Sequence, residues 1–177
     1  MVKFTKEMAV SASKDKIWEV FAHDFNNAYN WMASVPKSYH QSNGELFDGA
    51  KTDGRVCELT TKPEGMKASE QFIAYDEAKQ TATVKIDFVD TPSMFPVRYN
   101  TLEFSMKAIS EGQTEMIWKF SSRIKPLAYI MYPLIRKQFS SFVFEIMEEL
   151  KHYVENGSPH PRKVKAIEKQ KLRSRHK

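Results

Sequence analysis

The placement of helix signals constrains the fold of this chain more than any other feature of its sequence. From about residue 35 to residue 124, successive segments alternate apolar and polar residues and are joined by short polar turns, as in antiparallel strands. One long helical pattern follows over residues 134–156, where apolar residues recur every three or four positions. A sheet of this length has one face to cover, and this helix is long enough to cover it.

The N-terminal segment predicts a strand followed by two short helices. Residues 2–10 alternate in the manner of a strand, and Ser13 is a good N-terminal cap for the helix that follows. This helix fades near His23, and a second short turn is expected over residues 26–31. The chain is therefore predicted to be an α+β domain in which a meander of about six strands separates these elements from the long helix.

Composition supports a single globular domain. The chain has 177 residues, of which 41% are hydrophobic and 12% aromatic, and a domain of this size can bury a core without cross-links. Its one cysteine, Cys57, excludes an internal disulfide framework. The sequence has no apolar run of membrane-spanning length, and its first residues show no secretory signal pattern, so a cytoplasmic location is expected.

The positive charge is concentrated at the C-terminus. The formal net charge is +5, but eight Lys and Arg residues and one Glu follow residue 157, which leaves residues 1–157 with a net charge of −2. We therefore expect a folded domain over residues 1–157 and a basic, disordered tail over residues 158–177. Such a tail can contact a membrane or an acidic partner transiently, whereas a specific nucleic-acid site would require a positive patch on the domain itself.

Four stretches of the sequence, taken in order, resemble the START-like or SRPBCC superfamily, which includes the polyketide cyclase/dehydrase-like family and the birch-pollen-allergen type. They are ASKDKIWEVFAHDFNNAYNW, DGRVCELT, SEQFIAYDEAKQTATVKI and GQTEMIWKF, and the resemblance covers about residues 2–156. It implies a helix-grip fold, in which a curved antiparallel sheet of about seven strands wraps around the long C-terminal helix. It also implies a cavity between sheet and helix that holds a hydrophobic small molecule or lipid.

Side-chain alternation along the strands, together with the helix pattern, identifies residues that would face such a cavity. Large apolar residues at these positions are also typical of an ordinary core, and the two roles can coexist. The apolar candidates for ligand binding are Trp31, Phe72, Phe88, Trp118, Phe120, Phe139 and Val143.

Four polar residues, Arg55, Glu70, Arg98 and Asn100, are expected on the same apolar face and complete the set of ligand-binding candidates. Burying an unpaired charge costs about several kcal/mol, so these side chains pair with one another, line a wet pocket or lie at its rim. The resemblance favours a ligand contact for Glu70, because abscisic-acid receptors have a ligand-linked Glu in the matching stretch. The alternatives are an ion pair between Glu70 and Arg55, and a solvent-exposed strand end for Arg98 and Asn100.

One apolar loop is interpreted as a gate. Residues 89–97, VDTPSMFPV, join two strands and carry Met94 and Phe95 near the tip. As a lid, this loop would close over an apolar ligand, and the alternative is that it folds back onto the helix. Residues 127–135 are also apolar and would form the opposite lip, so both segments could rest on a membrane surface while a lipid passes.

Motifs for metal, cofactor or nucleophilic chemistry are not found in the sequence. The five histidines lack metal-ligand spacing, and no glycine-rich phosphate loop occurs. Cys57 is expected to be a buried, inert thiol, and His23 with Asp24 is interpreted as a capping or surface pair. We therefore expect neither a metal ion nor a cofactor.

Three functions remain open from the sequence. The leading hypothesis is binding or transport of a hydrophobic small molecule or lipid in the internal cavity. The second is a polyketide cyclase or dehydratase that uses the same cavity, with Glu70 as the catalytic acid or base and its pKa raised by burial. The third is a non-catalytic scaffold or co-chaperone-like module with a filled core, whose basic tail binds a partner.

Overall fold

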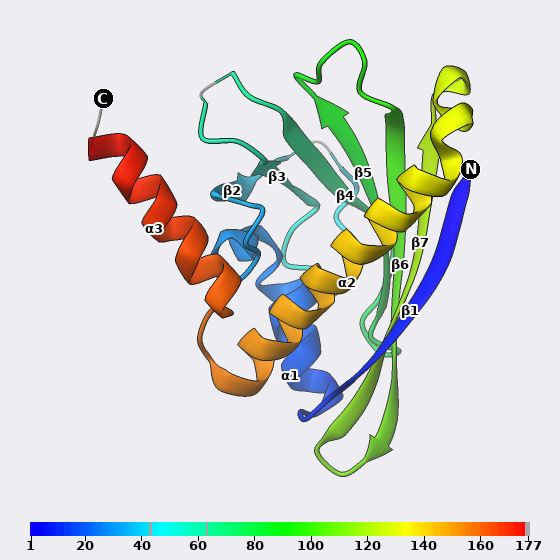
Figure 1. Ribbon diagram of the computed structural model, residues 1–177. Helices are drawn as coiled ribbons and strands as arrows, with labels where there is room; N and C mark the ends of the chain where they lie inside the picture. Colours follow the sequence, from blue (N-terminus) through cyan, green and yellow to red (C-terminus); the bar gives the residue numbers. More distant parts are fainter. Residues whose placement is uncertain (43, 63, 176–177) are drawn as a thin grey trace.

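The computed structural model describes residues 1–42, 44–62 and 64–175, and its elements follow the predicted order (Figure 1). The strands are β1 (Val2–Val10), β2 (Lys37–His40), β3 (Gly54–Glu58), β4 (Lys67–Asp76), β5 (Thr81–Val89), β6 (Val97–Ser110) and β7 (Gln113–Ile124). The helices are α1 (Lys14–Trp18), η1 (Glu19–His23), η2 (Phe25–Asn30), η3 (Pro126–Met131), α2 (Tyr132–Asn156) and α3 (Pro161–Arg175).

The seven strands form one antiparallel sheet with the order β1-β7-β6-β5-β4-β3-β2. Strands that are consecutive in sequence are neighbours from β2 to β7, and β1 pairs with β7 along its whole length. The sheet bends around α2, which lies across its concave face (Figure 1). The α+β class and the helix-grip architecture are therefore confirmed.

The two short helices after β1 are also confirmed, and the structure explains why the first pattern fades. Ser13 Oγ accepts a hydrogen bond from the backbone N–H of Lys16 at 3.3 Å and so caps α1. The chain then continues as the π-helix η1 and the 3-10 helix η2. These changes of helix type disrupt the regular 3.6-residue spacing, so the apolar pattern ends before the helical backbone does.

α2 is buried mainly through its C-terminal half. Its buried apolar side chains are Val143 near the middle of the helix and Met147, Leu150 and Val154 after it, whereas only Ile135 is buried in the turns before them. The helix ends at Gly157, whose φ of +65° is the left-handed conformation that glycine adopts easily. This unequal burial leaves space between the sheet and the N-terminal half of α2.

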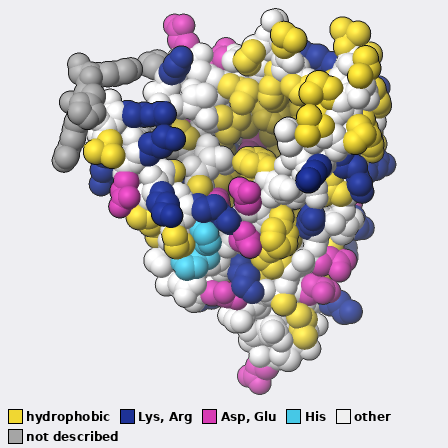
Figure 2. Space-filling view, viewed as in Figure 1, with side chains coloured by type: hydrophobic (Ala, Val, Ile, Leu, Met, Phe, Trp, Pro, Cys, Tyr) yellow, Lys and Arg dark blue, Asp and Glu magenta, His cyan; other side chains and the backbone are white. Residues whose placement is uncertain are grey.

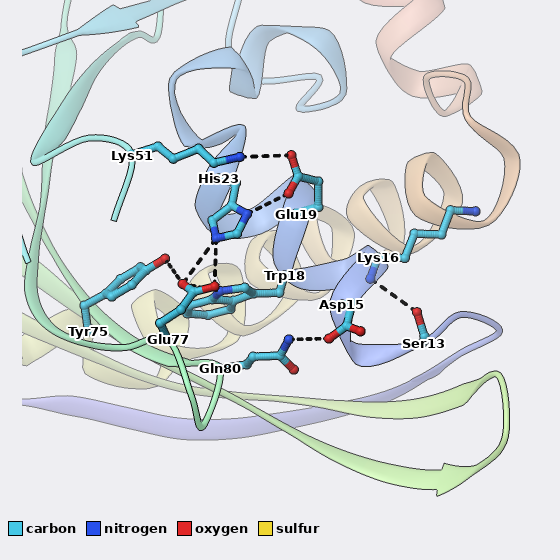
Figure 3. Close-up of polar contacts among 10 residues, drawn as sticks. All are labelled: Ser13, Asp15, Lys16, Trp18, Glu19, His23, Lys51, Tyr75, Glu77 and Gln80. Carbon is cyan, nitrogen blue, oxygen red and sulfur yellow. Dashed lines mark hydrogen bonds and ion pairs between the residues drawn. The ribbon is translucent and has the colours of Figure 1, made fainter. Parts of the chain in front are cut away.

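A polar cluster joins η1 to the turn that follows β4 (Figure 3). His23 lies between two carboxylates, with Nδ1 at 2.6 Å from Glu19 and Nε2 at 3.0 Å from Glu77. Glu77 also accepts hydrogen bonds from Trp18 Nε1 at 2.9 Å and from Tyr75 OH at 2.6 Å. The cluster therefore connects the N-terminal helices to the centre of the chain.

The interpretation of His23 and Asp24 as a pair is wrong. His23 follows Glu19 by four residues within the π-helix η1, and its ring pairs with the Glu19 carboxylate through Nδ1. The other ring nitrogen pairs with Glu77 in the turn between β4 and β5. The hydrogen bond from His23 also lowers the pKa of the Glu19 carboxyl. Asp24 instead accepts a hydrogen bond from Asn27 at 2.5 Å.

The C-terminal segment is helical, which corrects the prediction of a disordered tail. The first turn of α3 is held on the domain, because Lys163 is buried and donates to the Val35 carbonyl at 2.8 Å. Arg162 donates to Glu148 at 2.8 Å and to Glu149 at 3.0 Å. The sequence interpretation treated all basic residues of this segment as solvated and missed these two anchors. Residues 176 and 177 lie outside the described part of the chain.

We predict that Glu77→Ala destabilises the fold, because it leaves the indole N–H of the buried Trp18 without its acceptor. The expected loss is about 1–3 kcal/mol in the free energy of unfolding, measured by urea denaturation at neutral pH. Glu111→Ala is the control, since Glu111 is exposed on the turn between β6 and β7. It should change stability by less than about 0.5 kcal/mol.

The difference in unfolding free energy between wild type and Glu77→Ala should depend on pH. Burial raises the pKa of Glu77, but hydrogen bonds from Tyr75, Trp18 and His23 outweigh it and lower the pKa below its usual 4.5. Such a carboxyl stabilises the fold above its unfolded pKa and loses this contribution as the pH falls through its folded pKa. The difference between wild type and Glu77→Ala should therefore shrink below pH 4.5, and a constant difference would contradict this assignment.

Candidate functional site

A cavity of about 350 Å³ lies between the concave face of the sheet and α2. Figure 2 shows its opening as a hollow surrounded by hydrophobic side chains. Most of the predicted site residues lie on its wall, because the concave face of each strand follows the alternation in the sequence. These residues are Trp31, Arg55, Glu70, Phe88, Phe95, Asn100, Trp118, Phe120, Phe139 and Val143.

Two of the predicted ligand-binding residues lie elsewhere. Phe72 is buried, but Phe25 of η2 covers it at a ring distance of 4.4 Å, so it belongs to the core and not to the cavity wall. Arg98 is exposed because the pairing of β6 with β7 shifts between Val97 and Tyr99. This irregularity leaves Arg98 unpaired and turns it away from the concave face that alternation assigned to it.

The two residues of the predicted gate have different surroundings in the structure. Phe95 lies on the cavity wall, where its ring meets that of Phe88 edge-on at 5.0 Å. It also packs on the small core cluster that includes Ile135 of α2, so this part of the loop folds back onto the helix. Met94 is 92% exposed and does not line the cavity. Movement of the loop stays a prediction.

Sequence reasoning missed the wall residues that come from irregular segments. The chain between α1 and β2 and the connection after β3 have no alternation from which a facing direction could be read. Phe142 and Ile146 lie on the apolar stripe of α2, three and seven positions after Phe139, and this spacing could have identified them. The missed residues are Phe21, Phe25, Met32, Val35, Leu59, Met66, Phe142 and Ile146.

Arg55 and Glu70 form an ion pair on the cavity wall. Glu70 Oε2 accepts a hydrogen bond from Arg55 Nε at 2.8 Å and lies 2.6 Å from Arg55 Nη2 in an ion pair, and both side chains are buried. The guanidinium also lies 3.9 Å from the centre of the Phe25 ring. Burial lowers the pKa of Arg55, but Glu70 outweighs this and raises it above its usual value. The sequence left two alternatives open for Arg55 and Glu70, an ion pair or a position on the cavity wall. In the structure the two residues form an ion pair that lies on the cavity wall.

The described residues near the ion pair include neither a reactive thiol nor a metal-binding cluster. Cys57 is buried on β3, and burial together with the nearby Glu70 raises the pKa of its thiol to about 12, so it is a neutral, inert thiol as expected. Within the described residues, no group of three or more His, Cys, Asp or Glu side chains could hold a metal ion. No helix in that part of the chain is long and apolar enough to cross a membrane.

One transverse row of the sheet carries much of the polarity of the cavity. Strand register aligns Arg55 with Glu70, Glu70 with Ile86, Ile86 with Asn100, and Asn100 with Ser122. Neighbouring strands lie about 4.8 Å apart, and the row crosses five of the seven strands, from β3 to β7. Its β3–β4 end is satisfied by the ion pair, and its β6–β7 end carries an amide and a hydroxyl.

Buried polar atoms without hydrogen-bond partners gather at this cavity. In the part of the chain that the structure describes, they are Ser34 Oγ, Asn100 Oδ1, Trp118 Nε1 and Ser122 Oγ. The first three belong to wall residues, and Ser122 is the register partner of Asn100. An unsatisfied buried polar group costs about 1–3 kcal/mol. The cavity therefore carries hydrogen-bonding capacity that the protein itself does not use.

Comparison with solved structures agrees with this architecture. A START superfamily protein from Mycobacterium smegmatis superposes with a TM-score of 0.69 at 13% identity, over 88% of this chain and 99% of that chain. Ara h 8.0201 superposes with a TM-score of 0.63 at 15% identity, over 86% and 96% of the two chains. Truncated norcoclaurine synthase from Thalictrum flavum gives 0.59 at 16% identity, over 87% and 93%. Identities this low show the fold alone.

Comparison of the sequence itself identifies the family. No curated protein has a sequence that matches the chain. The family model described as polyketide cyclase / dehydrase and lipid transport matches residues 1–155, which include the complete sheet, the short helices and nearly all of α2. The chain therefore belongs to the family described as polyketide cyclase / dehydrase and lipid transport.

Proposed function

We propose that this protein binds and carries an apolar small molecule or lipid in the cavity between sheet and α2. The observation that carries the proposal is the apolar cavity of about 350 Å³. Left empty, a void of this volume would cost on the order of 8 kcal/mol, which is comparable to the stability of a whole domain. A ligand that replaces water there gains the burial of apolar surface on both sides.

The unpaired polar atoms narrow the class of ligand. Asn100 Oδ1 accepts a hydrogen bond, and the Ser122 hydroxyl beside it both donates and accepts. A ligand hydroxyl has the same two capacities and would satisfy both groups once the side chains turn toward it. We therefore propose an apolar ligand with one hydroxyl or similar hydrogen-bonding group, which lies near the β6–β7 end of the polar row.

The ion pair weighs against the catalytic alternative. A general acid or base must exchange a proton during turnover, but Glu70 already accepts a hydrogen bond from a buried guanidinium and forms an ion pair with it. Protonating Glu70 would leave Arg55 buried without a counter-charge, which is costly. The proposal therefore gives Glu70 a structural role beside the ligand, and a cyclase or dehydratase activity remains the second candidate.

The scaffold alternative assumes a filled core, and the cavity weighs against it. Contact with an acidic partner through α3 is still a proposal, supported by exposed lysines such as Lys165 and Lys169 on this helix. The cytoplasm is proposed as the compartment, in keeping with the single buried cysteine.

Filling the cavity should abolish ligand binding. We expect Val143→Trp to weaken binding of 1-anilinonaphthalene-8-sulfonate, and its displacement by long-chain alcohols, by about tenfold or more, equivalent to about 1.4 kcal/mol. The matched control is Val164→Trp, which places the same ring on α3, where Val164 is 41% exposed. Unchanged binding by Val143→Trp, with its near-UV circular dichroism intact, would refute the cavity as the binding site.

Asn100→Leu should stabilise the protein while it removes ligand discrimination. Replacing an unsatisfied buried amide by an apolar group of similar size should raise the free energy of unfolding by about 1–3 kcal/mol. Wild type should prefer a long-chain alcohol over its methyl ether, which cannot donate a hydrogen bond, and the variant should not. Thr101→Leu, one residue along β6 and facing the other side, is the control. A destabilised variant that keeps the preference would rule out this role for Asn100.

Glu70→Gln separates the structural role from the catalytic one. If Glu70 neutralises Arg55, the variant should lose about 3–5 kcal/mol of unfolding free energy. The double variant Arg55→Met with Glu70→Met, which removes both charges, should recover most of this loss. A catalytic Glu70 would give the opposite result, in which turnover disappears while stability and ligand affinity stay near those of wild type.

A further inference from the structure

Large apolar side chains surround the mouth of the cavity without any cover. Met94 is 92% exposed, Leu127 87% and Ile130 88%, and Met131 and Leu134 are also exposed. We call these five residues the mouth patch. None of the residues of η3 is buried, so this helical turn presents its apolar side chains to solvent. Contiguous exposed apolar surface of this kind marks an interaction site.

Two segments that are distant in sequence hold the mouth patch together. The backbone N–H of Lys125 donates to the Pro96 carbonyl at 2.8 Å, and Lys125 Nζ donates to the Ser93 carbonyl at 3.2 Å. The loop that carries Met94 is thereby fixed to the start of η3. The patch also adjoins the cavity, because Phe95 follows Met94 directly and lines the cavity wall. Figure 2 shows hydrophobic side chains gathered around the hollow.

The surroundings of the mouth patch are basic. Between Met116 and Phe144 the sequence contains five Lys and Arg residues and no Asp or Glu. Lys125, Arg136 and Lys137 flank the patch directly, and among the described residues none of the three has an ion-pair partner in the structure. The surface thus combines protruding apolar side chains with positive charge that is not neutralised.

We infer that the mouth patch docks on an anionic lipid bilayer, with its apolar side chains in the interface and Lys125, Arg136 and Lys137 against the headgroups. A second copy of the chain is a poorer occupant, because a symmetric contact would bring these basic residues together. The apolar side chains also protrude from two separate segments around an opening, which suits insertion between lipids. This inference goes beyond ligand binding, because it concerns a surface outside the cavity.

Vesicle flotation tests the inference with the full chain. We expect flotation with mixed phosphatidylcholine–phosphatidylserine vesicles, much weaker flotation with phosphatidylcholine alone, and loss of binding at high salt. Leu127→Glu combined with Ile130→Glu should reduce the bound fraction at least about tenfold. The control variants Ile109→Glu and Ile73→Glu introduce the same charge at apolar positions that are each 50% exposed away from the mouth. They should float like wild type.

Other outcomes would overturn the inference. Equal flotation with both vesicle types would exclude headgroup charge as the basis, and equal loss in the control variants would exclude the mouth patch. A wild-type dimer in sedimentation velocity that Leu127→Glu with Ile130→Glu dissociates would make the patch a face between two copies. Neither Leu127 nor Ile130 lines the cavity, so the double variant should still bind 1-anilinonaphthalene-8-sulfonate in solution. Loss of dye binding alone would count against the proposed function and not against the docking surface.

Discussion

The hydrogen bonds that hold the C-terminal half of α2 on the domain determine the rest of the structure. Glu149, in the buried half of the helix, accepts hydrogen bonds from the Ala33 N–H at 2.8 Å and from Arg162 at 3.0 Å. Lys151 Nζ donates to the Ala9 carbonyl at 2.6 Å. No comparable hydrogen bond or ion pair among the described residues fixes the side chains of residues 132–144. Hydrogen bonds therefore hold the C-terminal half of the helix, and its first turn packs through Ile135 on a small core cluster. The cavity lies beside the turns between these two attachments.

Two features of the structure, the cavity and the mouth patch, are unfavourable for stability. A fully packed apolar interior would be more stable than a cavity whose wall carries unpaired polar atoms, as at Asn100. The apolar surface at the mouth is equally unfavourable for a free soluble domain. Both features become favourable once something else is present, a ligand in the first case and a bilayer in the second. A carrier that loads at a membrane would need both at the same end of the molecule.

Periodicity predicted those parts of the fold and site that regular backbone controls. The strands, α2 and the wall residues Phe88, Phe120 and Val143 follow from alternation and helical spacing, because each facing direction repeats along the element. The exposed position of Arg98 could not be predicted, since a register shift in the sheet depends on its partner strand. The anchoring of α3 by Lys163 was missed for a similar reason, because its acceptor at Val35 is distant in sequence.

A crystal structure of the protein purified without organic extraction tests the central claim most directly. The account predicts a cavity that stays open between the sheet and the N-terminal half of α2, with continuous density for an apolar molecule inside it. A polar atom of that molecule should lie within about 3.2 Å of the Asn100 amide. A structure in which α2 packs directly on Ile86 and Asn100, with neither cavity nor bound molecule, would contradict this interpretation.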